Sequence, residues 1–441
     1  MIETLRHLLK ASDVSFLRIL WCDNANIIRV KATHINNLEG LEKGVSIAAA
    51  QQALPVMFDA IAPNSGLGPV GEAQLVPDWS SLKVLPFTES QAQVIGNMMH
   101  DDKAWEHCPR AFLQEQIAKL ADRGISIKAA FENEFFLLRK TADGYETADQ
   151  SIYAMTSSMN QHSEFMLELS DALAFIGIEI DYYYPESGPG QQEMSIRYRD
   201  ALSAADQQIH FRETVKGVAA NHDLVASFLP KVVENSAGSG CHLNISLWRD
   251  GKNITGDAEH STGLTSEAQV FIAGVLSNLP GLTALTIPSN NSFRRIRPHF
   301  WAGAFTTWGY GNREAAIRVT RGKQGANHFE LKVSDASANP YLALGGLLAS
   351  GLHGLEANTR LPEEVTIDPG HVPEEEQAAK HIYPLPGSLG EAIEKLKQND
   401  ALLNALGEQR AKAYLAVKQM EHDATKDLSL DEELKLLAER Y

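Results

Sequence analysis

The 441-residue sequence has few cysteines, no excess of basic residues and no long uninterrupted apolar run. Its three cysteines, Cys22, Cys108 and Cys241, lie far apart, are odd in number and form no CxxC pair. This arrangement argues against a disulfide framework or a cysteine-based zinc site, and it favours buried thiols in a reducing compartment. We therefore expect a cytoplasmic protein.

Positive charge is scarce, because 39 Lys and Arg face 56 Asp and Glu, for a formal net charge of -17. Without a basic block or stripe, neither nucleic acid nor an anionic membrane is an expected partner. Charged residues such as Arg6, Lys10 and Arg18 interrupt the N-terminal apolar residues, which excludes the core of a signal peptide. Residues 340–355 are too few and too rich in glycine to span a membrane, and they predict a buried helix beginning at Pro340.

Common nucleotide and hydrolase motifs are also missing. The glycine-bearing pieces GPGQQE, GSGCHLN and GYGNRE fit neither GxxxxGK[ST] nor a GxGxxG that opens a helix after a strand. The sequence contains no GxSxG motif of the kind that marks a catalytic serine, so a Ser-His-Asp triad has no local support. A P-loop and a dinucleotide fold are therefore not predicted.

Length and pattern predict two domains. Residues 1–103 alternate in short apolar runs separated by turn residues, which indicates a small, mostly β domain with little helix. Residues 104–441 mix helices and strands, and a helical pattern over 109–124 is closed by Gly124. A chain of this length exceeds a usual single core. We predict an α+β fold with a domain boundary near residue 104.

The C-terminal third is predicted to be scaffold. Ser388 and Glu391 form a capping-box pattern that begins a run of charged amphipathic helices. The acidic, proline-bearing residues 361–380 are most simply a solvated loop.

The stretch FENEFFLL, residues 131–138, predicts a strand with an unusual polar face. Alternation places Glu132 and Glu134 side by side on that face, where two ionised carboxylates repel each other. Residues 192–198, 241–248 and 328–334 likewise predict strands with one apolar face and one face bearing Glu, His, Arg or Asn. A half-exposed strand is the simpler interpretation of any one of them, but four together favour a shared concave site.

The polar faces and one nearby loop supply a set that could hold two hard divalent ions: Glu132, Glu134, Glu186, Glu193, His242 and Glu330. Oxygen-rich ligation with one imidazole suits Mg²⁺ or Mn²⁺, and a bound cation would relieve the carboxylate repulsion. The pieces NSFRRIRP and WGYGNREAAIRV add arginines, which match phosphate and carboxylate oxygens, although ion pairs with acidic residues are the competing explanation. Metal-binding carboxylates beside guanidinium groups indicate phosphoryl transfer.

In this order the motifs resemble the glutamine synthetase superfamily, and the resemblance covers nearly the whole chain. The matching pieces are FENEFFL, ESGPGQQE, LPKVVENSAGSGCHLNISL, NSFRRIRP, WGYGNREAAIRV and FELKVSDASANPYLAL. The pieces WCDNANIIRVKA and LVPDWSSLKVLPF resemble the small N-terminal β-grasp domain of that family. The resemblance implies a catalytic domain with a curved antiparallel sheet and flanking helices. It also implies a homo-oligomer, a dodecamer of two hexameric rings in which the next subunit completes each site.

The resemblance further implies ATP as co-substrate and two or more Mg²⁺ or Mn²⁺ ions in each site. Glu134, Glu186 and Glu193 match the ligands of one ion, and Glu132, His242 and Glu330 match those of the other. On the nucleotide side, Arg313 and Arg318 match phosphate binders and Ser246 matches the ATP site. On the glutamate side, Arg295 matches the arginine that holds glutamate, and Gly238 and Gly240 match the backbone beside the substrate. Asp59 and Lys332 match catalytic positions. In such enzymes the γ-phosphoryl group of ATP passes to the side-chain carboxylate of glutamate, and an amine then displaces phosphate.

Three departures from the family pattern concern the amine and the phosphate. The ammonium-handling loop keeps Asp59 but has Ala60 and Ile61 where small polar residues are usual, and Trp301 replaces the glutamate of the flap. Lys332 stands where the family has an arginine, so the charge is kept and the bidentate geometry is lost.

Loss of a carboxylate and gain of an indole favour an amine with an organic substituent, as in the branch that makes γ-glutamyl amides of polyamines, alkylamines or anilines. We therefore predict a glutamate–amine ligase. One alternative is an ammonia-using glutamine synthetase in which Trp301 only packs the flap. The other is an inactive ring-forming scaffold.

Overall fold

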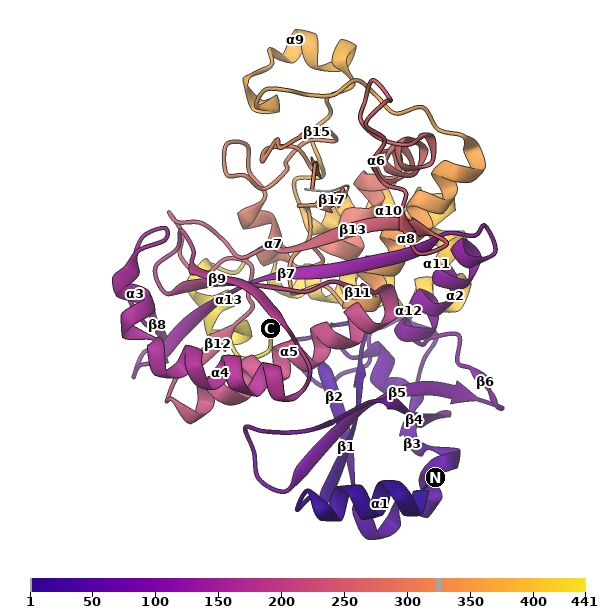
Figure 1. Ribbon diagram of the computed structural model, residues 1–441, viewed down its shortest axis with the longest axis vertical. Helices are drawn as coiled ribbons and strands as arrows, with labels where there is room; N and C mark the ends of the chain where they lie inside the picture. The colour runs from indigo at the N-terminus through magenta and orange to yellow at the C-terminus, as the bar shows by residue number, and fades with distance from the viewer. Residues whose placement is uncertain (1, 323–326) are drawn as a thin grey trace.

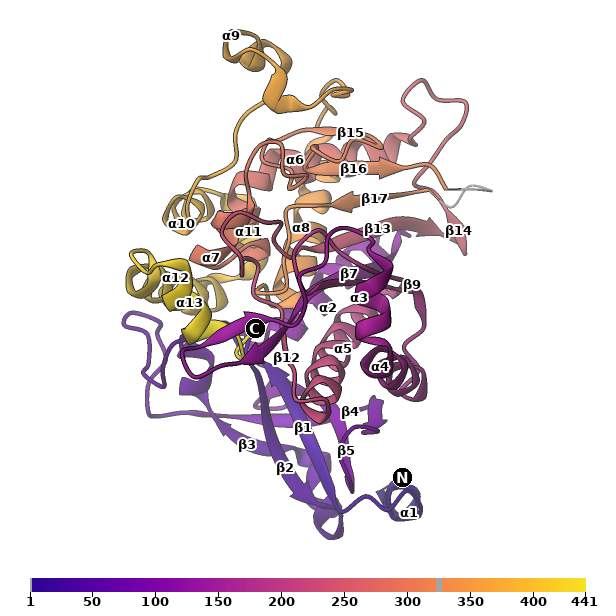
Figure 2. The same ribbon diagram turned by 90° about the vertical axis from the view of Figure 1, so that its left-hand side faces the viewer.

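The computed structural model describes residues 2–322 and 327–441. Two sheets organise this part of the chain, a six-stranded sheet near the N-terminus and an 11-stranded sheet further along (Figure 1). Helices lie against the larger sheet, and the C-terminal helices return to the boundary between the two sheets (Figure 2). The predicted α+β fold with a small N-terminal β domain is confirmed.

The N-terminal sheet has the order β2-β1-β5-β4-β3, with β6 paired to β5. Its strands are β1 (Phe16–Cys22), β2 (Ile28–His34), β3 (Val45–Ala48), β4 (Glu72–Val84), β5 (Gln91–His100) and β6 (Lys103–Ala104). Strands β1 and β5 are parallel, and the other pairs are antiparallel. Leu17, Ile19 and Trp21 alternate along β1 and share one buried cluster with Leu75 and Val94. The period-2 pattern of the sequence therefore builds this core.

Helix α1 (Ile2–Ala11) precedes the first strand, and the 3-10 helices η1 (Ile35–Lys43) and η2 (Ala49–Ala53) lie in the connections. Ile2 and Leu9 of α1 are buried, whereas Lys10 is exposed and Arg6 pairs with Glu39. The charges that interrupt the N-terminal apolar run thus occupy the polar side of an amphipathic helix. The predicted domain boundary falls at the end of β6 and stays a prediction.

The larger sheet has the order β15-β16-β17-β13-β7-β10-β9, and the short strands β8, β11, β12 and β14 pair at its margins. Its strands are β7 (Ser126–Lys140), β8 (Tyr145–Thr147), β9 (Ile180–Pro185), β10 (Gln191–Ile196), β11 (Arg199–Asp200), β12 (Val225–Ser227), β13 (Cys241–Arg249), β14 (Lys252–Asn253), β15 (Trp308–Tyr310), β16 (Ile317–Thr320) and β17 (His328–Leu331). All neighbours are antiparallel except β15 and β16. Figure 2 shows β16, β17, β13 and β7 one below the other.

The apolar face of this sheet is buried as predicted, and its polar face is buried as well. Phe131, Leu243 and Phe329 belong to the main hydrophobic cluster. On the opposite face, His242 is only 6% exposed and Glu330 is 0% exposed. The simpler interpretation of half-exposed strands is therefore wrong for β13 and β17, whose charged residues His242 and Glu330 are buried.

Helices surround the apolar face and form the C-terminal tail. They are α2 (Pro109–Ala121), α3 (Thr156–Gln161), α4 (Ser163–Phe175), α5 (Ala201–Asn221), α6 (Ser266–Thr286), α7 (Asn290–Arg295), α8 (Pro340–Ala357), α9 (Glu374–Gln377), α10 (Leu389–Lys397), α11 (Asp400–Leu406), α12 (Glu408–Thr425) and α13 (Leu430–Leu437). Helix α2 ends just before Gly124, which has φ +70°, and α8 begins at Pro340 after the capping residue Asn339. Both predicted helices are confirmed.

Helices α6 and α8 pack so closely that glycine is required at their contact. A Cβ on Gly274 would lie 2.5 Å from the Cα of Gly354. By length and composition, helix α6 is long and apolar enough to cross a membrane. However, 78% of its most apolar 18-residue stretch is buried inside the structure. Such burial is typical of the core helix of a soluble protein.

Residues 361–380 form a loop with the short helical segments η4 (Pro369–His371), α9 and η5 (Ala378–Lys380). The prediction of a solvated loop is only partly correct, since Val365 and Val372 are buried in a small cluster with Phe305. The predicted capping box at Ser388 is also incomplete, because the carboxylate of Glu391 accepts a hydrogen bond from Gly387 N. In the C-terminal region the full box occurs instead at the start of α13. The three cysteines are free and buried, as expected.

Candidate active site

The register of three adjacent strands brings one histidine and two glutamates together. His242 of β13 pairs directly with Glu132 of β7, and Glu330 of β17 pairs with Asn244, two residues along β13. His242 Nδ1 lies 3.0 Å from Glu330 Oε1 and 3.8 Å from Glu132 Oε1. One ligand atom from each of the three residues lies within 4.8 Å of the others, which is close enough to surround one metal ion.

Electrostatics bind this trio together. Burial raises the pKa of Glu132, but the adjacent His242 outweighs that effect and lowers the pKa to about 2. Burial also opposes ionisation of Glu330, but Lys332, His242 and Arg318 hold its pKa below the ordinary value. Burial and Lys332 lower the pKa of His242, yet the two carboxylates raise it overall. Attraction between the imidazole and the two carboxylates therefore holds the trio together.

Two of its buried atoms lack a hydrogen bond of good geometry among the described residues, His242 Nδ1 and Glu330 Oε2. Each still has an oppositely charged neighbour, Glu330 Oε1 at 3.0 Å from His242 Nδ1 and Arg318 Nε at 2.6 Å from Glu330 Oε2. A divalent cation would satisfy both atoms, and two carboxylates with one imidazole suit Mg²⁺ or Mn²⁺. The chemistry of this trio thus fits one of the two predicted ions.

The second predicted ligand group lies beside the first. Glu134 of β7 and Glu193 of β10 are direct cross-strand neighbours, and His242 Nε2 lies 3.9 Å from Glu134 Oε1. Burial raises the pKa of Glu193 to about 10, with further contributions from Glu132 and Glu134. Burial also raises the pKa of Glu134, and the charge of Glu186 adds to the effect. Like charges directly opposite each other are unfavourable, so this group needs either protons or a cation.

Two of the predicted phosphate-side cations converge on the trio. Arg318 of β16 places Nε 2.6 Å from Glu330 Oε2, and Lys332 places Nζ 3.4 Å from Glu330 Oε1. Lys332 is only 3% exposed. Positive charge and candidate metal ligands therefore share one buried region, as phosphoryl transfer requires.

The predicted glutamate-binding arginine lies against the glycine stretch. Arg295 Nη2 donates to the carbonyl of Ser334 at 2.9 Å, while its Nε is buried without a partner among the described residues. A Cβ on Gly238 would lie 2.9 Å from Arg295 Cγ, and one on Gly240 would lie 2.6 Å from His242 Nε2. Both glycines therefore allow the backbone to approach site residues closely.

Gln191 is a site residue that the sequence analysis missed. Its Nε2 donates to Glu134 Oε2 at 3.0 Å and to the carbonyl of Gly238 at 3.2 Å. Gly240 N donates to the same glutamate oxygen at 2.9 Å. Gln191 thus orients a predicted metal ligand and ties it to the glycine stretch. Alternation along the quoted GPGQQE piece, which places Gln191 on the face of Glu193, could have revealed it.

A cavity of about 640 Å³ borders the trio, and Glu132 and Ser246 line it. Lys128 Nζ lies in this cavity 4.7 Å from the ring centre of Trp248 and 5.7 Å from that of Tyr198. Ser246 Oγ accepts a hydrogen bond from Trp248 Nε1 at 2.8 Å. The cavity therefore combines apolar rings with polar groups next to the candidate metal ligands, as a nucleotide site requires.

The family model for the catalytic domain of glutamine synthetase matches residues 106–436. The chain belongs to the glutamine synthetase family. It is 32% identical to "Type-1 glutamine synthetase 1" of Dictyostelium discoideum over 98% of this chain and 91% of that protein. It is 35% identical to "Gamma-glutamylpolyamine synthetase GlnA3" of Streptomyces coelicolor over 94% of this chain and 91% of that protein.

Solved structures of the glutamine synthetase family agree. "Crystal structure of novel glutamine synthase homolog" has a TM-score of 0.86 and 29% identity, and covers 97% of this chain and 99% of that one. "GmaS/ADP complex-Conformation 1" has a TM-score of 0.84 and 26% identity, and covers 97% and 98% respectively. These matches confirm the predicted superfamily and its glutamate–amine ligase branch, and they assign γ-glutamyl ligase chemistry to the chain. Family membership leaves open whether the nitrogen donor is ammonia or an organic amine.

The predicted flap is the segment between α7 and β15, residues 296–307, and two exposed aromatic residues lie near the middle of this segment, which we call its tip. Trp301 is 57% exposed and Phe300 is 52% exposed. The guanidinium of the exposed Arg313, a predicted phosphate binder, lies 5.4 Å from the ring centre of Trp301. Trp301 N donates to the carboxylate of Glu314 at 2.8 Å.

Asp59 is separate from the other predicted site residues. Its side chain is 89% exposed and lies 4.0 Å from Arg29. It lines a cavity with Arg212 and Lys216, and none of the predicted metal ligands lines that cavity. Within a single chain the structure therefore brings the six candidate ligands, Arg295, Arg318 and Lys332 into one region and leaves Asp59 outside it.

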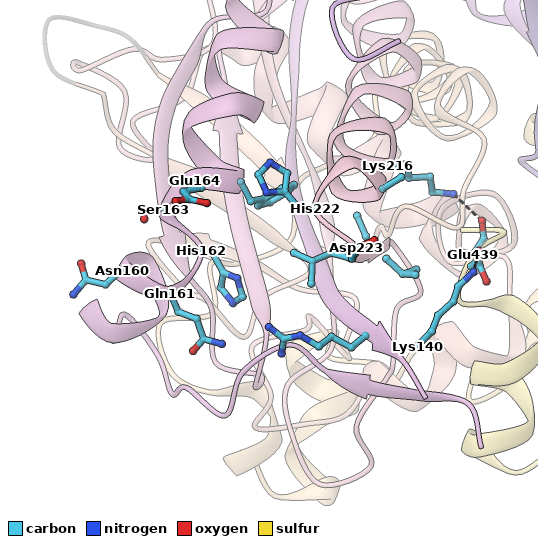
Figure 3. A pocket seen from close by; sticks show the side chains of 16 residues that line it. Lys140, Asn160, Gln161, His162, Ser163, Glu164, Lys216, His222, Asp223 and Glu439 are labelled. Carbon is cyan, nitrogen blue, oxygen red and sulfur yellow. Dashed lines mark hydrogen bonds and ion pairs between the residues drawn. The ribbon is translucent and has the colours of Figure 1, made fainter. Parts of the chain in front are cut away.

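A further cavity of about 1000 Å³ lies between α4, α5 and β12, and none of the predicted site residues lines it (Figure 3). Three of its ionisable residues already have partners. Lys216 donates to the carbonyl of Glu439 at 3.2 Å, Lys140 pairs with the Glu439 carboxylate at 3.0 Å, and His222 pairs with Glu168 at 2.8 Å. We assign no catalytic role to this cavity.

Proposed function

We propose that this member of the glutamine synthetase family is an ATP-dependent ligase that joins the γ-carboxylate of glutamate to an organic amine through γ-glutamyl phosphate. The observation that carries the proposal is the aromatic tip of the flap, where Trp301 stands in place of the family's glutamate. An indole offers apolar and π surface to the substituent of an alkylammonium ion and offers no anion to NH₄⁺.

The residues of the site divide into groups by their chemistry. Glu132, His242 and Glu330 would hold one Mg²⁺ or Mn²⁺ ion, and Glu134, Glu186 and Glu193 would hold another. Bound metal would supply charge neutralisation to the phosphates of ATP. Arg318 and Lys332 add positive charge on the phosphate side, and Arg295 would hold glutamate beside Gly238. The cavity lined by Ser246 would take the nucleoside of ATP.

The surroundings of Trp301 support an organic amine. The carboxylate of Glu314 accepts a hydrogen bond from the flap backbone, so it is already engaged, and burial raises its pKa. Lys231 lies 5.9 Å from the ring centre of Phe300, and Arg313 lies 5.4 Å from that of Trp301, so each ring lies within range of a cation. A flap that accommodates cations on aromatic rings suits an amine that carries charge and hydrocarbon together. The polyamine-specific name of the Streptomyces coelicolor relative supports the same choice.

Ammonia is the second candidate, and the retained Asp59 is the observation that favours it. An inactive scaffold is disfavoured, because a scaffold has no need of buried carboxylates around His242. Lys332, which stands where the family has an arginine, still contacts Glu330 and keeps a positive charge in the site. We further propose that the protein works as a cytoplasmic homo-oligomer, a dodecamer of two hexameric rings.

We expect Trp301→Glu to raise the ratio of kcat/KM for ammonium over that for the best organic amine by about tenfold, since about 1.4 kcal/mol of differential binding gives that factor. A carboxylate at this position restores an anion to the flap. Steady-state phosphate release with both nitrogen donors measures the ratio. Trp301→Ala serves as the matched control, because it removes the indole without adding charge. It should lower the rate with the organic amine and leave the rate with ammonium unchanged.

An equal fall in rate for both donors in both variants would assign Trp301 to flap packing and would remove it from amine selection. Because the side chain of Trp301 is exposed, neither substitution should disturb folding, and misfolding would not explain such a result.

A further inference from the structure

A second group of metal-binding side chains lies outside the catalytic region, where the flap meets the 361–380 loop. His299 Nδ1 lies 2.6 Å from Asp368 Oδ2, and His371 Nδ1 lies 3.9 Å from the same oxygen. The two imidazole rings are stacked, with centres 4.7 Å apart and an interplanar angle of 30°. One ligand atom from each residue lies within 4.8 Å of the others.

The backbone is shaped to bring these side chains together. His299 has φ +67°, a conformation that is uncommon for a residue with a side chain. A Cβ on Gly370 would lie 2.8 Å from His299 Cε1, so the turn needs glycine for the ring to approach it. Asp368 Oδ1 accepts a hydrogen bond from Gly370 N at 2.8 Å, which orients the carboxylate and leaves Oδ2 facing the histidines.

The group joins two segments that are distant in the sequence. His299 belongs to the flap, two residues before Trp301, whereas Asp368 and His371 belong to the 361–380 loop. This loop is fixed to the connection between β15 and β16, outside the flap, since Asn312 Nδ2 donates to the carbonyl of Val365 at 2.7 Å. Anything that binds all three side chains would therefore tie the flap to a fixed part of the structure.

The donor set differs from that of the catalytic region. Two imidazoles and one carboxylate suit Zn²⁺ and neighbouring transition metals, whereas the oxygen-rich catalytic set suits Mg²⁺ or Mn²⁺. Three protein ligands leave one position of a tetrahedral ion for water. The side chains of His299 and His371 are 49% and 71% exposed, so an ion can reach them.

We propose that His299, Asp368 and His371 form a binding site for a divalent transition metal such as Zn²⁺, which fastens the flap to the 361–380 loop. This site is independent of the catalytic metals and of the identity of the amine.

The test uses His371, because it separates metal binding from a simple hydrogen-bonded contact. At 3.9 Å from Asp368 its nitrogen makes no hydrogen bond there, so the His299–Asp368 contact persists without it. His371→Phe keeps a ring against His299 but offers no ligand atom. His100→Phe is the control, because His100 is also an exposed histidine next to a carboxylate, 3.5 Å from Asp101, but it has no second imidazole in a three-donor group.

Co²⁺ is titrated into the untagged protein in the presence of saturating Mg²⁺, and its visible absorption and stoichiometry are recorded. We expect the unmodified chain and His100→Phe to bind one more Co²⁺ per chain than His371→Phe, with tetrahedral absorption that Zn²⁺ displaces. In His371→Phe the affinity of that site should fall at least tenfold. Equal Co²⁺ binding by all three proteins would overturn the proposal. So would the absence of any Co²⁺ binding outside the catalytic sites that Mg²⁺ occupies. Unchanged melting temperature and oligomer size establish that the variants are folded.

Discussion

Replacing His242 or Glu134 by alanine is expected to lower kcat/KM for phosphate release by about a thousandfold. The two residues belong to the two different candidate ligand groups, and His242 Nδ1 is a buried atom without a good hydrogen bond among the described residues. A Lewis-acid ion stabilises transition-state charge by several kcal/mol, and about 1.4 kcal/mol corresponds to a factor of ten. Steady-state rates over a series of Mg²⁺ and Mn²⁺ concentrations measure the loss.

His162→Ala provides a matched control for His242→Ala. His162 is a buried histidine paired with Asp149 at 2.7 Å, as His242 is paired with Glu330, but it lies outside both ligand groups. Any loss of activity in the control should follow the loss of folded protein measured by thermal melting. Near-native turnover of His242→Ala and Glu134→Ala at ordinary Mg²⁺ concentrations would contradict the assignment of both metal sites.

A mixed assembly of Asp59→Asn and Glu134→Ala chains is expected to recover activity that neither variant has alone. Asp59 is exposed in its own chain and lines a cavity apart from the candidate ligands, as expected of a residue that completes the site of a neighbouring copy. In a ring, a site between a native Asp59 and a native Glu134 forms at about a quarter of the interfaces of a random equal mixture. The mixture should therefore show about a quarter of the native rate.

The experiment requires dissociation and reassembly of the two variants together, with each variant treated alone as control. The contact of Asp59 with Arg29 spans 4.0 Å at the surface, so Asp59→Asn should fold and assemble normally. Light scattering checks the size of each assembly. Full activity of Asp59→Asn alone, or of an isolated monomer, would remove both the catalytic role of Asp59 and the shared site.

Much of the catalytic sheet could be predicted because its strands alternate strictly. Period 2 fixed which side chains share a face, and the antiparallel register then placed Glu132 beside His242. The helices at Pro109 and Pro340 were predictable because proline and the residues around it mark helix ends locally. The six candidate ligands came from the polar strand faces and one loop, the family resemblance divided them between two ions, and the structure draws three of them into one compact group.

Other features depend on contacts between distant parts of the chain. Gln191 bridges Glu134 and the glycine stretch; alternation with Glu193 could have placed it on the polar face, but its bonds to these two partners depend on the fold. The polarity of a single strand favoured a half-exposed face, and four strands together favoured a concave site, but the complete burial of Glu330 against His242, Arg318 and Lys332 depends on the fold. The contact of Arg313 with Trp301 and the contact of His299 with the 361–380 loop also join distant residues, so neither could be predicted from the sequence.

The central claim is that the nitrogen donor is an organic amine. The most direct measurement is a competition in which the enzyme receives ATP, Mg²⁺, glutamate and equal concentrations of ammonium and one amine, with the products identified by mass spectrometry. The competing amines are a monoamine, a diamine and a polyamine, taken one at a time. We expect the γ-glutamyl amide of at least one of them to exceed glutamine in the product mixture. Glutamine as the dominant product against every amine would contradict the account.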